Sequence, residues 1–269
     1  MSGQIVPGGS RKLKNRVSPQ AVIGNSLTMA YRTLLLIRRT PQQLFDVTIQ
    51  PILFTLMFTF LFGGAISGSV SGYLPIIIPG ILAQTAITAS MATGVQLRED
   101  MDKGVFYRFK SMPIARIAPL AGPLLADVVR YSIATALTFA MGYLLGFHWV
   151  SPGAALLAGF LAVFAAWCLG WVFALLGVLA KTAQTVQGIS AAIIFPLGFL
   201  SGAFVPTETL PRWLQDFVNV NPLTYVVSAV RQLLDQGTIG TDFWLSLIGS
   251  TVLVLVFAPV TLKMYMRKA

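Results

Sequence analysis

The chain has 269 residues, of which 55% are hydrophobic and only 10% are charged, and its mean hydropathy is +0.76. A soluble domain carries about 25% charged residues, so this composition excludes an ordinary soluble enzyme. The 19 Lys and Arg residues outnumber 9 Asp and Glu residues, which gives a net charge of +10. Because the basic residues lie between long apolar runs, we expect their anionic partner to be membrane lipid rather than nucleic acid.

Six apolar segments are long enough to cross a bilayer. A spanning helix needs about 20 mostly apolar residues, because the hydrocarbon core is about 30 Å thick and a helix rises about 1.5 Å per residue. The segments that meet this requirement are residues 45–66, 73–97, 120–147, 152–180, 182–205 and 243–264. Since runs of this length satisfy their backbone in lipid as helices, the sequence predicts an all-α membrane protein with six transmembrane helices.

The positions of the basic residues predict the orientation of the chain. Lys and Arg in short loops are retained on the cytoplasmic side. Sixteen of the nineteen fall in the N-terminal arm, the second-to-third and fourth-to-fifth connections, and the C-terminal tail. The opposite face holds only Arg212 and Arg231, and Arg130 lies inside the third segment. We therefore expect a multi-pass protein of the cell membrane with both termini in the cytoplasm.

Two elements precede the first apolar segment. Residues 1–19 are polar and basic, and we expect them to form a flexible cytoplasmic arm. Residues 20–40 carry apolar side chains at alternating steps of four and three, at Ile23, Leu27, Ala30, Leu34 and Ile37. This spacing predicts an amphipathic helix that lies on the cytoplasmic membrane surface. The alternative is a helix packed on other protein.

The residues that a membrane enzyme would need are absent from the sequence. With one cysteine, Cys168, and one histidine, His148, the chain cannot build a Cys/His metal cluster. It contains no G-x-S-x-G, H-E-x-x-H or G-x-x-x-x-G-K-[ST] motif, so it has no P-loop for a nucleotide. We expect no catalytic site, no metal and no cofactor on this chain.

One ionisable pair lies inside the third apolar segment. Asp127 and Arg130 are three residues apart and therefore share one face of a helix. A charge inside the membrane is a functional candidate, here for a proton relay. The sequence favours the other interpretation, in which the two charges neutralise each other near the lipid headgroups.

The connection between the second and third apolar segments, residues 98–116, is short and densely charged. Glu99 precedes Lys103 by four residues, an orientation that supports a helical turn. Phe106 and Phe109 place apolar anchors among the charges. This pattern is typical of an element that docks on a cytoplasmic protein; the alternative is an ordinary helix at the membrane interface.

Pro and Gly interrupt the apolar sequence at the end of the fifth segment and beyond it. Irregular backbone at membrane depth is tolerated where it is buried in protein or lines a water-filled cavity. Residues 210–234, which lie within the predicted re-entrant segment 206–238, are apolar but too interrupted to span the bilayer. We predict that they form short re-entrant or surface helices on the outer side, which close a pathway from outside.

These two regions together resemble the membrane subunit of an ABC type-2 exporter of the daunorubicin-resistance type. The resemblance rests on DKGV at 102–105, RFKSMPIAR at 108–116, FLSGAFVP at 199–206, LPRWL at 210–214 and NPLTY at 221–225. It extends from Ile23 to the tail, with residues 41–269 as the transmembrane domain. Family members commonly carry Glu at the position of Tyr107, and this departure is typical of the drug-resistance subgroup.

The resemblance implies a permease that works with other subunits. Two cytoplasmic ATP-binding subunits would bind ATP and Mg and hydrolyse the nucleotide, and a second membrane subunit, expected to be a copy of this chain, would complete the transporter. Residues 20–40 would be the connecting helix and residues 98–113 the coupling helix. The residues implied in coupling to the ATPase are Arg98, Glu99, Asp100, Asp102, Lys103, Gly104, Phe106, Arg108, Phe109 and Pro113.

The resemblance also implies a substrate pathway lined by the second and fifth spans. Candidate lining residues are Gln84, Thr85, Thr88, Gln184, Gln187, Phe195 and Phe199, and candidate residues of the extracellular gate are Pro206, Trp213 and Pro222. The implied mechanism is alternating access, which would export a hydrophobic or amphipathic drug or lipid-like substrate. Two alternatives remain at this point: a membrane anchor for a cytoplasmic partner, and an ion-driven secondary carrier.

Overall fold

The fold is all-helical over the described part of the chain, as the sequence predicts. A computed structural model describes residues 18–104, 114–115, 117–204, 207 and 210–268. Within these residues the helices are α1 (Pro19–Arg39), α2 (Pro41–Ser67), α3 (Val70–Asp102), α5 (Ala118–Leu144), α6 (Pro152–Leu179), α7 (Ala183–Phe199), α8 (Arg212–Val220), α9 (Pro222–Gln236) and α10 (Thr241–Lys268).

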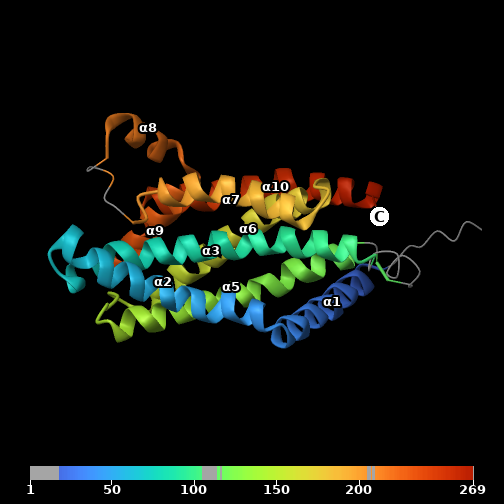
Figure 1. Cartoon of the computed structure of the whole chain (residues 1–269), viewed down its shortest axis with the longest axis horizontal. Helices are drawn as coiled ribbons and strands as arrows, with labels where there is room; N and C mark the ends of the chain where they lie inside the picture. Colours follow the sequence, from blue (N-terminus) through green and yellow to red (C-terminus); the bar gives the residue numbers. More distant parts are fainter. Residues whose placement is uncertain (1–17, 105–113, 116, 205–206, 208–209, 269) are drawn as a thin grey trace, which may run out of the picture.

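Six of these helices run up and down along one long axis, namely α2, α3, α5, α6, α7 and α10 (Figure 1). The last residues of α3, the turn between α6 and α7, and the end of α10 gather at one end, here called the C-terminal end (Figure 1). The short helix α8 projects at the opposite end, here called the α8 end. The centre of the bundle is formed by α3 and α6, which pack on each other and on most of the other helices.

Among the described residues, five helices are long and apolar enough to cross a membrane: Thr48–Ser67 within α2, and the whole of α3, α5, α6 and α10. The predicted fifth span is shorter than expected, because α7 ends at Phe199 and has 17 residues. At about 1.5 Å per residue it extends about 26 Å, less than the hydrocarbon core of about 30 Å. The count of six spans is therefore not confirmed. The helices α8 and α9 have 9 and 15 residues, and their re-entrant placement stays a prediction.

The helix α1 packs along α5 at the C-terminal end (Figure 1). Along the predicted apolar stripe, Ala30 and Ile37 are buried, whereas Ile23 and Leu27 are 61% and 57% exposed; the placement of this helix on the membrane surface stays a prediction. A Cβ atom on Gly122 of α5 would overlap the Cβ of Met29, so the two helices are in very close contact. Small side chains permit such contact, and the larger apolar side chains consequently face outward.

The contact between α3 and α6 brings two backbones together. A Cβ atom on Gly94 would overlap the carbonyl oxygen of Phe173, and one on Gly177 would overlap the carbonyl oxygen of Gly94. Glycine, alanine and serine favour this kind of helix packing, because they let the helix axes approach closely. The core face of α6 is rich in such residues, including Ala158, Ala162, Ala165, Ala166, Gly170 and Ala174.

Substitution of Gly94 by alanine tests this contact. The added methyl group has no space unless α3 and α6 separate, so we expect Gly94→Ala to lower the free energy of unfolding by about 1–3 kcal/mol. The matched control is Gly249→Ala on α10, where a Cβ would meet open space and better helix propensity should raise stability by up to about 1 kcal/mol. Thermal or denaturant unfolding of the purified protein measures both, and equal effects would refute the close contact.

Candidate functional site

The described part of the predicted coupling helix is the last turn of α3 and the two residues that follow it. The Arg98 guanidinium reaches inward: Nε donates to Oδ1 of Asp102 at 3.0 Å, and Nη1 donates to the carbonyl oxygen of Ala180 at 2.9 Å. The side chain of Arg98 is only 16% exposed. Arg98 therefore connects the end of α3 to the end of α6.

A second cation binds the same helix end. The ammonium group of Lys268, at the end of α10, donates to the carbonyl oxygen of Val178 at 2.7 Å. The last carbonyl groups of a helix have no partner within the helix, and their partial negative charge favours cations. Arg98 and Lys268 supply both the missing hydrogen-bond donors and the positive charge. They thereby hold α3, α6 and α10 together at the C-terminal end.

The other described residues of the predicted docking segment lie nearer the surface. Glu99 and Lys103 form an exposed ion pair of 3.1 Å, as their spacing predicts, and Asp102 is also exposed. Asp100 is half-buried within electrostatic range of Arg32 on α1. At Gly104 the backbone takes a left-handed conformation, with φ at 67°, which glycine adopts without strain. The remaining residues of the set, Phe106, Arg108, Phe109 and Pro113, lie outside the described residues.

The predicted pathway residues divide into two groups. On α3, Gln84, Thr85 and Thr88 are half-buried. The Gln84 side chain lies against the helix α7, since a Cβ atom on Gly198 would overlap its Oε1. This oxygen is buried and has no hydrogen-bond partner among the described residues. The structure thus brings Gln84 into contact with the second helix of the predicted pathway.

On α7, the predicted residues Gln184, Gln187, Phe195 and Phe199 are all exposed. Only one stripe of this helix is buried, at Val186, Ser190, Ile194 and Gly198. The Phe199 ring stacks on Phe204 with centroids 5.0 Å apart, and Phe204 stacks on Phe58 of α2 at 4.7 Å. An aromatic row therefore extends from the end of α7 to α2.

At the α8 end, three side chains hold the last turn of α7 and the non-helical segment that follows it. The Asn221 amide donates to the carbonyl oxygens of Leu197 and Leu200, each at 2.8 Å. Tyr73 of α3 donates its hydroxyl proton to the carbonyl oxygen of Phe204 at 2.8 Å, and Arg231 of α9 donates to that of Gly202 at 3.0 Å. We call Tyr73, Asn221 and Arg231 the outer clasp, after the side of the membrane on which the sequence predicts this end of the bundle.

The outer clasp has a clear physical role. Backbone carbonyl groups that are buried away from water need a hydrogen-bond partner, and each one left unpaired costs about 1–3 kcal/mol. The clasp supplies such partners where α7 ends. The segment is also in very close contact with α3, because a Cβ atom on Gly80 would overlap the carbonyl oxygen of Ala203. Burial lowers the pKa of Arg231, and Asp235 beside it offsets part of that shift.

The outer clasp was not among the sequence-predicted gate residues. Of the predicted set, Trp213 is 70% exposed on α8, Pro222 is exposed at the start of α9, and Pro206 lies outside the described residues. Asn221 before Pro222 carries a recognisable signal, because Asn followed by Pro is typical of a helix start. Nothing in the sequence indicates that Tyr73 contacts Phe204, which lies 131 residues further along the chain.

The ionisable pair of the third apolar segment is buried between α3 and α5. Arg130 and Asp127 form an ion pair of 2.8 Å, with side chains 4% and 2% exposed. Asp127 also accepts a hydrogen bond from Thr93, and Arg130 donates to the carbonyl oxygen of Ala89 at 2.7 Å. The ion pair that the helical spacing predicts is present, and both side chains also bind α3; its place near the lipid headgroups stays a prediction.

Replacing Asn221 tests the outer clasp. Asn221→Ala removes two hydrogen bonds to α7 and the side-chain cap of α9, so we expect the free energy of unfolding to fall by about 2–3 kcal/mol. Asn219→Ala, at an exposed position of α8, is the matched control and should change it by less than about 0.5 kcal/mol. Chemical denaturation measures both variants; indistinguishable midpoints would contradict the clasp.

The buried pair is tested by a double-mutant cycle. Asp127→Asn leaves the Arg130 charge uncompensated and should cost about 3–5 kcal/mol of stability. In the variant that also carries Arg130→Met, this penalty should be much smaller, because no buried charge remains. Unfolding of the single and double variants gives the coupling energy. Strictly additive effects would show that the two side chains do not neutralise each other.

Comparison with known proteins identifies the family. A family model described as "ABC-2 type transporter" matches residues 25–234. The daunorubicin resistance ABC transporter permease protein DrrB1 of Streptomyces coeruleorubidus is 38% identical over 94% of this chain and 90% of its own length. A probable doxorubicin resistance permease, DrrC of Mycobacterium tuberculosis, is 28% identical over 58% of this chain and 56% of its own. The chain is thus a multi-pass membrane protein that belongs to the ABC-2 type transporter family.

Proposed function

We propose that the chain is the permease subunit of an ATP-driven exporter that moves hydrophobic or amphipathic drugs out of the cytoplasm or the inner leaflet. The names of the relatives support this substrate class, since two of them are described as daunorubicin and doxorubicin resistance permeases. ATP and Mg would be bound by a partner subunit, because this chain has no P-loop motif. The complex would hold two such ATP-binding subunits and a second copy of this chain.

The observation that carries the proposal is the connection of α3 to α6 through Arg98. The predicted coupling segment begins where α3 ends, and Arg98 fixes this point to the carbonyl oxygen of Ala180. A force applied to the coupling segment would therefore move α3 and α6 together. A free loop could not transmit force in this way. The arrangement supports the transporter over a passive membrane anchor.

The same helix reaches the α8 end. The 33 residues of α3 extend about 50 Å at about 1.5 Å per residue. Near its start, Tyr73 binds the carbonyl oxygen of Phe204, and α3 also packs on α7. In the proposed alternating-access cycle, closure of the ATP-binding subunits displaces α3 at the C-terminal end and changes its contacts with the segment after α7. This segment would then open or close the outer side of the pathway.

The candidate pathway residues fit an amphipathic substrate. They combine amide and hydroxyl groups on Gln84, Thr85 and Gln187 with the aromatic rings of Phe195 and Phe199. Aromatic and apolar walls with a few polar groups are typical of sites for drug-sized molecules. None of the candidate residues carries a charge, so we expect weak discrimination among substrates of similar hydrophobicity.

Loss of Arg98 should uncouple the transporter. In a complex reconstituted with its ATP-binding subunits, we expect Arg98→Ala to reduce daunorubicin transport per ATP hydrolysed by about tenfold, while the subunits still copurify. Arg98→Lys should retain part of the transport, since lysine can still donate to a helix-end carbonyl. Fluorescence uptake into inverted vesicles and phosphate release measure the ratio.

Arg212→Ala, at an exposed position of α8, serves as the control and should leave the ratio unchanged. Unaltered transport per ATP in Arg98→Ala would contradict the coupling role of Arg98. Transport driven by an ion gradient in the absence of any ATP-binding subunit would overturn the proposed function itself, in favour of a secondary carrier. Binding of the ATPase without any transport would favour the anchor.

A further inference from the structure

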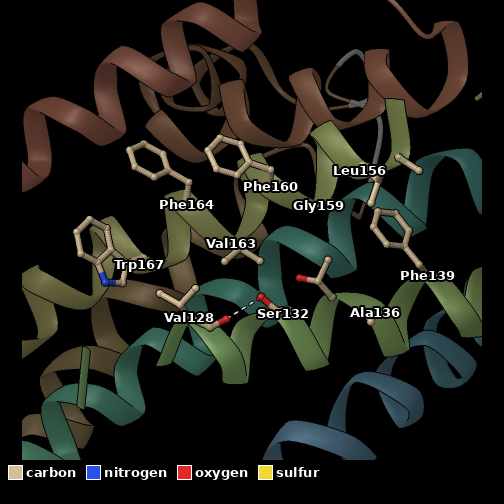
Figure 2. A pocket seen from close by; sticks show the side chains of 12 residues that line it. Val128, Ser132, Ala136, Phe139, Leu156, Gly159, Phe160, Val163, Phe164 and Trp167 are labelled. Carbon is tan, nitrogen blue, oxygen red and sulfur yellow. Dashed lines mark hydrogen bonds between the residues drawn. The ribbon is translucent and has the colours of Figure 1, made fainter. Parts of the chain in front are cut away.

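We propose that the outward face of α5 and α6 holds a binding site for one membrane glycerolipid. An apolar groove of about 470 Å³ runs along the seam of the two helices, between residues 128–139 of α5 and 155–167 of α6. Figure 2 shows it from close by, with Trp167 at one end and Phe139 and Leu156 at the other. We call it the α5–α6 groove.

The groove lies at bilayer depth, because both of its walls are span-length helices. Its surface is apolar: Phe160 and Leu156 are 58% and 76% exposed, and the hydroxyl of Ser132 is turned back onto the carbonyl oxygen of Val128 at 2.8 Å (Figure 2). An acyl chain fits such a surface, since it needs no polar partner along its length.

A second pocket continues the groove toward the C-terminal end. It has a volume of about 370 Å³ and lies between residues 22–27 of α1, residues 121–125 of α5, and Trp167 and Trp171 of α6. Trp167 lines both cavities. From Leu156 to Trp171, α6 rises about 22 Å, which is more than the thickness of one leaflet, about 15 Å of a core of about 30 Å. The two cavities together could accommodate a chain from one leaflet.

Two indole N–H groups at this end have no hydrogen-bond partner in the part of the chain that the structure describes. The indole nitrogens of Trp167 and Trp171 are both buried and lack a hydrogen-bond acceptor among the described residues. The Trp171 side chain is 9% exposed, and its ring meets that of Trp167 edge-on at 6.0 Å. Burying an N–H group without an acceptor is unfavourable. Glycerolipids carry ester oxygens where the acyl chains begin, and these oxygens could accept from the two N–H groups.

The position of the groove favours a resident lipid over exported cargo. The predicted pathway residues lie on α3 and α7. The main packing partners of α5 are α1, α3, α2 and α6, and α7 is not among them. In Figure 1, α5 and α7 lie on different sides of α3. A lipid bound here would also contact the exposed apolar residues Ile23 and Leu27 of α1, and would thereby link α1 to the bundle.

Native mass spectrometry of the full-length chain, purified in mild detergent and equilibrated with dioleoyl phosphatidylethanolamine, tests the proposal. We expect the wild-type chain to retain one lipid. Ala136→Phe fills the groove from an exposed position of α5 and should lower the retained fraction about tenfold. Val252→Phe, at an exposed position of α10 outside the groove, should bind as the wild type does.

Removal of the indole N–H groups is the second arm. Trp167→Phe and Trp171→Phe keep an aromatic ring but lose the donor, and each should lower retention about three- to tenfold. Trp244→Phe, exposed on α10, is the control. If Ala136→Phe fails to fold, Trp167→Phe and Trp171→Phe still test the lipid site.

Three results would overturn the proposal. Wild-type retention of lipid in Ala136→Phe and in both Trp variants would show that the site is not occupied by lipid. Displacement of the lipid by daunorubicin, together with loss of daunorubicin binding in Ala136→Phe, would assign the groove to the exported substrate. A change in oligomeric state of Ala136→Phe with unchanged lipid retention would assign it to a second copy of the chain.

Discussion

The rest of the structure depends on the close contact between the backbones of α3 and α6. Helices in lipid gain little from the hydrophobic effect between them, so close packing and interhelical hydrogen bonds must hold them together. Gly94 and Gly177 allow the backbones to touch, and Arg98 adds a hydrogen bond to the end of α6. Because α3 and α6 contact α2, α5, α7, α9 and α10 between them, this pair sets the position of the other spans.

Both ends of the bundle meet the same requirement, which is to provide partners for carbonyl groups at helix ends. At the C-terminal end, Arg98 and Lys268 bind the last carbonyl groups of α6. At the α8 end, Asn221 binds those of α7, and Tyr73 and Arg231 bind the segment that follows. Since α3 contributes Arg98 to one set and Tyr73 to the other, it is the element through which the two ends can influence each other.

The sequence predicts much of this architecture, because hydropathy over about 20 residues reports directly on spanning helices. It overestimates the fifth span, since residues 200–204 are apolar but leave the helix, with Gly202 at a φ of 66°; hydropathy does not distinguish an apolar turn from a helix. It does not predict that Ser26 and Thr33 of α1 are buried, because neither belongs to the apolar stripe. The close contact between α1 and α5 depends on a small residue, Gly122. A hydrophobic stripe on α1 does not reveal such a contact.

The candidate site is predicted less completely than the fold. The ion pairs Glu99–Lys103 and Asp127–Arg130 follow from helical spacing and are present. The contacts Arg98–Ala180 and Tyr73–Phe204 join residues 82 and 131 positions apart, and no local pattern encodes them. They depend on how α3 meets its neighbours.

The central claim is that α3 and α6 move as one unit when the ATP-binding subunits close. Distances between spin labels at Lys103→Cys and Lys181→Cys, two exposed positions beside the ends of α3 and α6, test it directly, since the native Cys168 is buried. In the reconstituted complex, the account predicts the same distance without nucleotide and with trapped ATP, while the distance from Lys103→Cys to a label at Trp213→Cys on α8 changes. A changed distance between the labels at 103 and 181 would contradict it.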